Sequence, residues 1–292
     1  MDIGMSLPTM ASGYTRETTV EWCRRLDDSP FSSVSAGERM TFQNPELFTT
    51  LAAAAALTER VRVMANVVVL PWHSAGLVTK QLLTIEQLAP ERLVVGVGVG
   101  GREEDYATVG VPFASRHARL DAGVAEFLRL WSGEIPDGAT APLGPRPSVE
   151  SGPPLLAGAL GPKAMARAAQ WADGVTGFSV GGVADEMAGT FRLAEKAWGE
   201  AGRAESPRLV TGCFFALGPD AGTRLREGVH AYLRVFGDRF ADAMASTVTA
   251  SDPDAVRAVL DGAAAAGADE VVLVPMSTDL ACLTEAAVVV AD

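Results

Sequence analysis

Eight short apolar runs alternate along this chain with segments of helical pattern. The runs are rich in β-branched residues and predict buried strands at residues 2–7, 31–35, 60–70, 93–97, 155–157, 174–178, 208–217 and 270–274. Helices are predicted at 18–26, 47–59, 73–88, 116–131, 161–171, 184–199, 220–244 and 252–266. This alternation predicts a parallel sheet, either closed as a (β/α)8 TIM barrel or open and doubly wound. The count of eight favours the barrel, as a single domain over residues 1–292.

Local signals mark some helix ends and one interruption of the pattern. Asn44 is expected to cap the helix at 47–59, with Pro45 at its first position. The segment 134–154 is rich in proline and glycine and has little periodicity. It is predicted to be an irregular insertion before the fifth strand that partly covers the site.

The composition indicates a large core and an acidic surface. Hydrophobic residues make up 48% of the chain, and the net charge is −12. This charge excludes the basic footprint of a nucleic-acid binder, and anionic membranes would repel the protein. The three cysteines are far apart without a CxxC pair, and no signal sequence or bilayer-length apolar run is visible. A cytoplasmic protein with a small-molecule partner is therefore expected.

The strand at 93–97 runs into glycines at its carboxyl end. Gly96, Gly98, Gly100 and Gly101 remove side chains at the edge where parallel α/β folds bind their ligands, so a flat ligand can lie on the backbone. The spacing also fits the G-x-G-x-x-G pattern of nicotinamide cofactors, but Asp121 lies in a helix rather than at the end of a second strand. A backbone-lined flavin-type pocket is favoured, with structural glycines as the plain alternative.

Two later segments are candidate anion sites. Residues 177–181 match G-x-S-x-G, but a hydrolase needs a later acid and histidine, and only His230 follows. The alternative is a loop in which the Ser179 hydroxyl and free amides hold a phosphate. Gly161 and Pro162 begin a helix directly after a strand, which either binds an anionic group or is an ordinary turn.

Few polar residues are candidates for proton transfer. His73 follows the third strand near the carboxyl face, where it is either a proton donor or a polar residue at a helix start. Glu38 and Arg39 follow the second strand as a charged pair that faces either the pocket or the surface. No metal site is predicted, because the three histidines share no ligand spacing.

Three segments together carry a family resemblance. They are residues 67–71 with 82–88, residues 92–101 with 103–106 and 110–113, and residues 116–121 opening the helix to Trp131; the triplet 172–174 agrees. The pattern resembles the luciferase-like flavin and deazaflavin oxidoreductases, a family of (β/α)8 barrels.

The resemblance implies a ring of reduced FMN or of F420 at the carboxyl face. Asn66 and Val67 match the family's non-proline cis peptide, and Gly98 and Gly100 would flank the ring. The other implied cofactor contacts are Leu160, Gly161, Pro162 and Ser179, on the ribityl chain and phosphate, and Ser6 at the end of the first strand.

The chain departs from the F420-dependent sugar dehydrogenases of this family at several positions. Glu38 and Arg39 replace an Asp-His pair, Gly101 replaces a Glu, and Gly181 or Gly182 replaces a lysine that some F420 binders carry. Phosphate binding is therefore expected to use backbone amides.

The sequence thus predicts a flavin- or deazaflavin-dependent oxidoreductase that acts on a small organic substrate. Reduced FMN would bring oxygen chemistry and F420 would bring hydride transfer. Glu38, Arg39 and His73 are the candidates for proton handling or substrate anchoring. By resemblance, the partners are a separate flavin or F420 reductase and a second copy in a homodimer. The alternatives are a catalytically silent flavin-binding barrel and a nicotinamide-dependent dehydrogenase.

Overall fold

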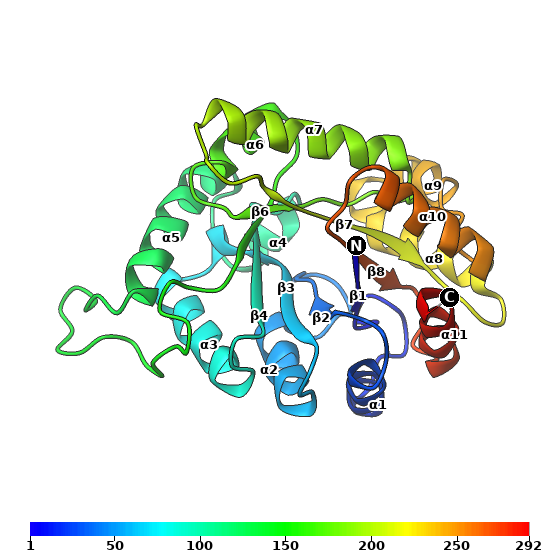
Figure 1. The fold of residues 1–292 in the computed structure, drawn as a ribbon, viewed down its shortest axis with the longest axis horizontal. Helices are drawn as coiled ribbons and strands as arrows, with labels where there is room; N and C mark the ends of the chain where they lie inside the picture. Colours follow the sequence, from blue (N-terminus) through cyan, green and yellow to red (C-terminus); the bar gives the residue numbers. More distant parts are fainter. Residues whose placement is uncertain (292) are drawn as a thin grey trace.

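All eight predicted strands form, and they close into a barrel. The computed structural model describes residues 1–291, and its strands run parallel in sequence order, with the first pairing to the last. The strands are β1 (Asp2–Ser6), β2 (Ser33–Ala36), β3 (Arg62–Val69), β4 (Leu93–Gly98), β5 (Leu155–Gly158), β6 (Gly174–Thr176), β7 (Arg208–Phe215) and β8 (Glu270–Pro275). Figure 1 shows them at the centre of the molecule. The (β/α)8 prediction is confirmed, and the open-sheet alternative is wrong.

Helices connect the strands and cover the outside of the barrel (Figure 1). They are α1 (Arg16–Asp27), α2 (Leu47–Leu57), α3 (Ala75–Leu88), α4 (Glu103–Thr108), α5 (Arg116–Trp131), α6 (Pro162–Ala168), α7 (Ala184–Glu200), α8 (Ala221–Leu233), α9 (Asp238–Ala245), α10 (Pro253–Ala265) and α11 (Leu280–Ala291). Short 3-10 helices occupy η1 (Leu70–Trp72), η2 (Phe113–Ser115) and η3 (Arg234–Phe236).

The core has two layers because successive strand residues face opposite sides of the barrel wall. One buried cluster fills the interior and takes one residue from each of five strands: Met64, Val94, Leu156, Val210 and Val272. A second, larger cluster lies between the strands and the helices, and includes Val63, Val95 and Trp22. This double burial explains why the strand segments are continuously apolar in sequence.

Charged side chains close the amino end of the barrel. The buried carboxylate of Glu270 accepts hydrogen bonds from Ser33 at 2.6 Å and from Arg208 at 2.7 Å. Arg62 lies 3.0 Å from the same carboxylate. The amino end is thus filled by a layer of paired charges, in which only Nε of Arg62 and Nε of Arg208 lack hydrogen-bond partners among the atoms of these three side chains that are buried.

The cap of α2 differs from the prediction. Glu46, not Asn44, is the N-cap, and its carboxylate accepts the backbone N–H groups of Phe48 at 3.0 Å and Thr49 at 2.7 Å. The Asn44 amide donates instead to the carbonyl of Pro45 at 3.1 Å. A carboxylate also interacts favourably with the helix dipole there.

Other helix boundaries also differ. The predicted helix at 220–244 is broken into α8 and α9 at Gly237, which adopts a φ of 102° that favours glycine. The helix after Gly161 ends at Ala168 rather than at Trp171. The sequence interpretation also missed α4 and α11.

The insertion at residues 134–154 is irregular, as predicted, but it does not cover the site. It projects away from the barrel between α5 and β5 (Figure 1) and contributes no residue to the main cavity. Its Ser148 hydroxyl donates to Glu86 on α3, and the Trp131 indole donates to the carbonyl of Val149 at 3.2 Å. The insertion therefore packs against α3 and α5, on the outside of the barrel.

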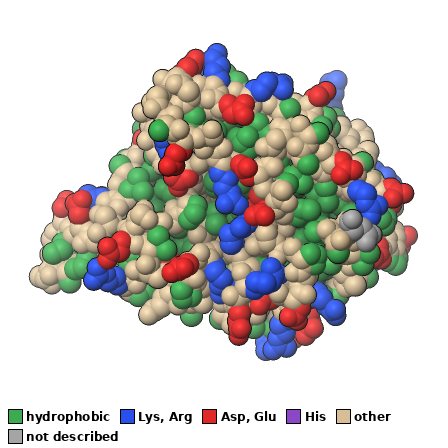
Figure 2. Space-filling view, in the orientation of Figure 1, with side chains coloured by type: hydrophobic (Ala, Val, Ile, Leu, Met, Phe, Trp, Pro, Cys, Tyr) green, Lys and Arg blue, Asp and Glu red, His purple; other side chains and the backbone are tan. Residues whose placement is uncertain are grey.

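The surface mixes charges of both signs. Figure 2 shows acidic and basic side chains interspersed on one face, with hydrophobic side chains between them. Within residues 1–291, no helix has the combination of length and apolar character that crossing a bilayer requires.

Candidate active site

A cavity of about 580 Å³ opens at the carboxyl ends of the strands. All eight strands, or the residues directly after them, contribute to its lining, and the helices α5, α6 and α8 add side chains. Its volume lies within the usual range for a small-molecule or cofactor site, roughly 300–1,000 Å³. In a (β/α)8 barrel, active sites lie at this end.

Two glycines on neighbouring strands form a flat shelf in the cavity. Gly98 of β4 and Gly158 of β5 are register partners, and both line the cavity. A Cβ atom at Gly98 would lie 3.0 Å from Cγ2 of Val67, and one at Gly158 would lie 3.2 Å from Cγ1 of the same residue. These glycines, here called the glycine shelf, therefore leave backbone exposed beside Val67 where any side chain would intrude.

The shelf adjoins the end of β3, where the backbone is irregular. The peptide bond between Asn66 and Val67 is cis, as the family resemblance implies. The pairing of β3 with β4 shifts register between Ala65 and Val68. The Asn66 side chain accepts a hydrogen bond from Thr176 of β6 at 2.9 Å, so its amide is held across the barrel.

Most residues that the sequence assigned to the cofactor lie around this cavity. Ser6, Asn66, Val67, Gly98, Gly100 and Leu160 line it. Gly161 and Pro162 do not; they begin α6 directly after Leu160, whose side chain is 79% exposed. Their roles in binding stay predictions.

Ser179 lies outside the cavity lining, and its hydroxyl is already engaged. The Oγ donates to Glu186 at 2.6 Å and accepts the backbone N–H of Val183 at 2.8 Å. Its side chain thus ties the loop after β6 to the start of α7, and it is buried there. Its role in binding a phosphate stays a prediction.

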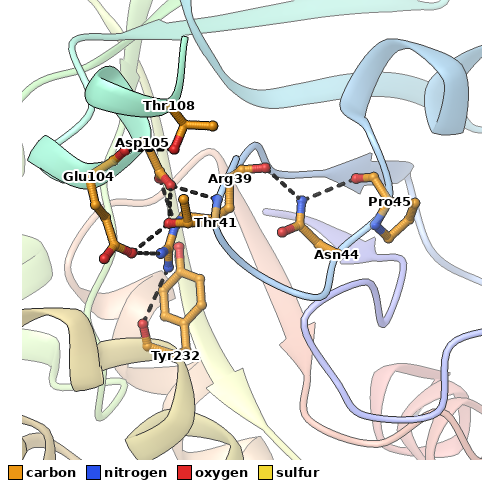
Figure 3. Close-up of polar contacts among 8 residues, drawn as sticks. All are labelled: Arg39, Thr41, Asn44, Pro45, Glu104, Asp105, Thr108 and Tyr232. Carbon is orange, nitrogen blue, oxygen red and sulfur yellow. Dashed lines mark hydrogen bonds and ion pairs between the residues drawn. The ribbon is translucent and has the colours of Figure 1, made fainter. Parts of the chain in front are cut away.

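Arg39 lies at the centre of a buried ionic network above the barrel (Figure 3). Its Nε donates to Asp105 at 2.8 Å, and its Nη1 donates to the carbonyl of Tyr232 at 3.5 Å. Asp105 also accepts the backbone N–H of Thr41 at 2.8 Å. The side chains of Arg39 and Asp105 are only 2% and 1% exposed. The network joins the loop after β2 to α4 and α8, three elements around the cavity.

Burial alone would raise the pKa of Asp105, but its partners reverse the effect. Hydrogen bonds from Thr41 and the positive charge of Arg39 outweigh the loss of solvation and lower the pKa below its ordinary value of 3.8. Asp105 therefore remains a carboxylate at neutral pH, as the network requires.

Glu38 points to a different partner. Its Oε1 lies 2.7 Å from Nε2 of His73, and its Oε2 accepts the backbone N–H of Val69 at 2.7 Å. The Glu38 side chain is 4% exposed and that of His73 is 20% exposed. Glu38 and Arg39 are thus neither a cavity-facing pair nor a surface pair, because each is buried against a different element. None of these three residues lines the cavity.

The matched family model describes luciferase-like monooxygenases, and it covers residues 1–273. This chain belongs to the luciferase-like monooxygenase family. A relative in that family, 4-hydroxyprotoasukamycin monooxygenase of Streptomyces nodosus subsp. asukaensis, is 29% identical over 201 residues, or 63% of this chain and 53% of that protein. A Mycobacterium tuberculosis protein is 32% identical over 208 residues, covering 68% of this chain and 72% of its own length. The chain thus spans about half the length of the first relative.

Solved luciferase-like structures share the fold at low identity. An F420-dependent secondary alcohol dehydrogenase in complex with an F420–acetone adduct aligns with a TM-score of 0.79 and 18% identity, over 100% of this chain and 99% of its own. The oxygenating constituent of 3,6-diketocamphane monooxygenase of Pseudomonas putida, in complex with FMN, aligns with a TM-score of 0.74 and 14% identity, over 99% and 96%. One fold thus carries either cofactor.

The cavity at the carboxyl ends of the strands also contains polar side chains that the sequence interpretation did not assign to the site. Arg102, Arg116 and Arg167 line it, as does Tyr232 of α8. Arg116 and Arg167 lie on α5 and α6, whereas Arg102 follows β4. Arg102 and Arg116 lie in or beside the segments that carry the resemblance, but Tyr232 gave no signal, since the cavity forms only when the barrel closes.

Three buried polar atoms at the cavity lack hydrogen-bond partners: Oγ of Ser35, Nε of Arg102 and Nε1 of Trp171. Buried polar atoms are normally satisfied, so unpaired ones in a cavity indicate ligand contacts. Within residues 1–291, no group of His, Cys, Asp and Glu side chains is arranged to hold a metal ion. Burial raises the pKa of Cys213 to about 12, so that thiol is not a nucleophile at neutral pH.

Proposed function

We propose that this chain is a flavin- or deazaflavin-dependent oxidoreductase that acts on a small organic substrate, with reduced FMN or F420 as its cofactor. The observation that carries the proposal is the glycine shelf. Gly98 and Gly158 are paired side by side without side chains, and Val67 lies against them. A flat ring system fits such a surface, because its face can approach the backbone closely.

The residues present suit both ends of such a cofactor. The lining around the shelf is apolar and includes Val67, Val97 and Ala157, which matches a ring face. Arg116 and Arg167 place guanidinium groups on the same side of the barrel, on the helices that follow β4 and β5, and Arg167 is also paired with Asp121. Guanidinium groups are suited to phosphate and carboxylate groups of the kind that a cofactor tail carries.

The protein's contribution in this proposal is binding, orientation and exclusion of water. When bound, reduced FMN supplies electrons for reaction with oxygen, whereas reduced F420 supplies a hydride. The shelf fixes the plane of the ring, and the aromatic side chains of Phe178, Phe214 and Tyr232 keep water from the opposite part of the cavity. A separate reductase, a homodimer and a cytoplasmic location belong to the same proposal.

The three residues that the sequence suggested for proton handling or substrate anchoring, Glu38, Arg39 and His73, take different roles in this proposal. Oε1 of Glu38 lies 2.7 Å from Nε2 of His73, so the pair is the candidate for proton handling behind the end of β3. Arg39 is a positioning residue, because it does not line the cavity and contacts Tyr232, which does. Phosphate binding is assigned to arginine side chains, not to Ser179.

The test is titration of the purified protein with FMN, reduced FMN and F420. Quenching of tryptophan fluorescence reports binding, because Trp171 lines the cavity, and the absorbance of each ligand gives a second signal. We expect saturable binding of one cofactor class. Selective F420 binding assigns hydride transfer, and selective FMN binding assigns oxygen chemistry. Binding of NAD(P) alone, or of none of these ligands, would refute the proposal.

A further inference from the structure

The cavity has a second half, which the proposed cofactor does not need. The glycine shelf belongs to β4 and β5, and Arg116 and Arg167 lie on the helices after those strands. The remaining wall comes from the other side of the barrel: Phe178 after β6, Phe214 of β7, Val274 of β8, Met10 after β1 and Tyr232 of α8. The part of the cavity beside this wall is left for a substrate.

The wall presents a continuous aromatic surface. Phe178 and Phe214 meet edge to face with ring centroids 4.6 Å apart, and Phe214 meets Tyr232 at 5.6 Å. All three rings line the cavity. Phe178 is 41% exposed, so apolar surface remains uncovered at this wall. A surface of this kind favours an apolar, ring-bearing ligand body, because aromatic faces and edges stack on it.

Arg102 lies against the same wall. It follows β4, and its guanidinium lies 4.5 Å from the ring centroid of Tyr232 and 5.0 Å from that of Phe236. Because those rings belong to α8 and η3, which follow β7, the side chain reaches across the mouth of the barrel. Arg102 therefore places a positive charge beside the aromatic wall, away from the helices that hold Arg116 and Arg167.

Within residues 1–291, the charge of Arg102 is met by aromatic rings rather than by an ion pair. Its buried Nε has no hydrogen-bond partner. Among residues 1–291, no carboxylate lies within ion-pair distance of it, and the nearby Asp105 is already bound to Arg39. Burial lowers the pKa of Arg102, although the guanidinium remains charged at neutral pH. Arg102 is a partly buried cation without an ion pair, and a ligand anion would supply one.

We infer that the substrate is an organic acid whose apolar ring stacks on Phe178, Phe214 and Tyr232 and whose carboxylate binds Arg102. This inference rests on the proposed function, because the cofactor is assigned to the glycine-shelf half. It adds the chemical class of the substrate, which neither the fold nor the family determines.

The experiment compares a carboxylate with its neutral isostere. The probes are 4-tert-butylbenzoate and 4-tert-butylbenzamide, titrated by calorimetry into the full chain, with and without the bound oxidised cofactor. The wild-type protein should bind the benzoate about tenfold or more tightly than the amide, as a charged hydrogen bond implies. Arg102→Gln should reduce this ratio to near one, and Arg102→Lys should keep part of it. Thermal unfolding confirms that each variant is folded.

Arg234→Gln is the matched control, because it removes the same charge from exposed η3 outside the cavity lining. It should leave the acid-to-amide ratio unchanged. Equal binding of acid and amide, binding of neither, or a ratio that survives Arg102→Gln would overturn the inference. If Arg102→Gln weakened only cofactor binding, Arg102 would belong to the cofactor's tail. Failure of the cofactor to bind, with the acid preference intact, would instead refute the proposed function alone.

Discussion

The buried pair between Arg39 and Asp105 makes a stability prediction that the structure quantifies. Substituting Arg39 by Met keeps an unbranched apolar stem but removes the guanidinium, and so leaves the Asp105 carboxylate buried without its charged partner. The two groups are 2.8 Å apart and almost fully buried, so removing one should cost about 3–5 kcal/mol of unfolding free energy. For a chain of 292 residues this corresponds to a melting temperature lower by roughly 5–8 °C.

The same substitution at an exposed pair provides the control. Arg16 lies 3.7 Å from Glu17, and both side chains are largely exposed. Arg16→Met should therefore change the unfolding free energy by less than about 1 kcal/mol. Urea denaturation followed by circular dichroism measures both variants. The interpretation of Arg39 is refuted if its variant loses no more stability than the Arg16 variant.

The pKa of Asp105 adds a pH dependence with a defined sign. Because folding lowers this pKa below 3.8, the carboxylate contributes stability that is fully present above pH 3.8 and is lost as the pH falls through the lower folded value. The stability difference between wild type and Asp105→Asn should thus be constant from pH 7 to about pH 5 and shrink below about pH 4. A difference that stayed constant down to pH 2 would contradict the assigned pKa shift.

Three further predictions concern the site and its surroundings. Gly158→Val should weaken cofactor binding about tenfold or more, because the Cβ alone would already lie 3.2 Å from Cγ1 of Val67. Gly199→Ala is the control and should leave the affinity unchanged, because a Cβ at this position of α7 would lie in open space. Ser179→Ala should cost about 1 kcal/mol in urea denaturation, through the lost hydrogen bonds to Glu186 and to the N–H of Val183, and leave cofactor affinity within about twofold. The three buried cysteines should not react with a thiol reagent in the native protein at pH 8, but should react in denaturant; rapid native labelling would contradict their burial.

The strands were predictable because each must be buried on both faces. The segment predicted at 208–217 became β7 (Arg208–Phe215), and that predicted at 270–274 became β8 (Glu270–Pro275). A strand that is buried between the barrel interior and the helices accepts almost only apolar residues, so its apolar run is easy to recognise in the sequence. Helix caps were less predictable, since Asn44 and Glu46 can both cap a helix and only the backbone geometry chooses between them.

The site was predictable where it depends on backbone and less so where it depends on distant side chains. The glycines at the end of β4 were a clear signal in the sequence. So many glycines at a strand end have few explanations other than the close approach of a ligand or of another backbone. The role of Gly158 beside Gly98 can be inferred only from the register of β4 with β5. The contact of Arg102 with Tyr232 joins the loop after β4 to helix α8, so no local pattern could indicate it.

The glycine shelf is proposed to hold the ring of the cofactor. A crystal structure of the protein in complex with the cofactor that it binds would test this placement. We predict that one face of the ring lies in van der Waals contact with the Cα atoms of Gly98 and Gly158, next to Val67, with the anionic tail directed to Arg116 and Arg167. A ring stacked instead on the aromatic wall of Phe178 and Phe214, or bound outside the cavity, would contradict the account.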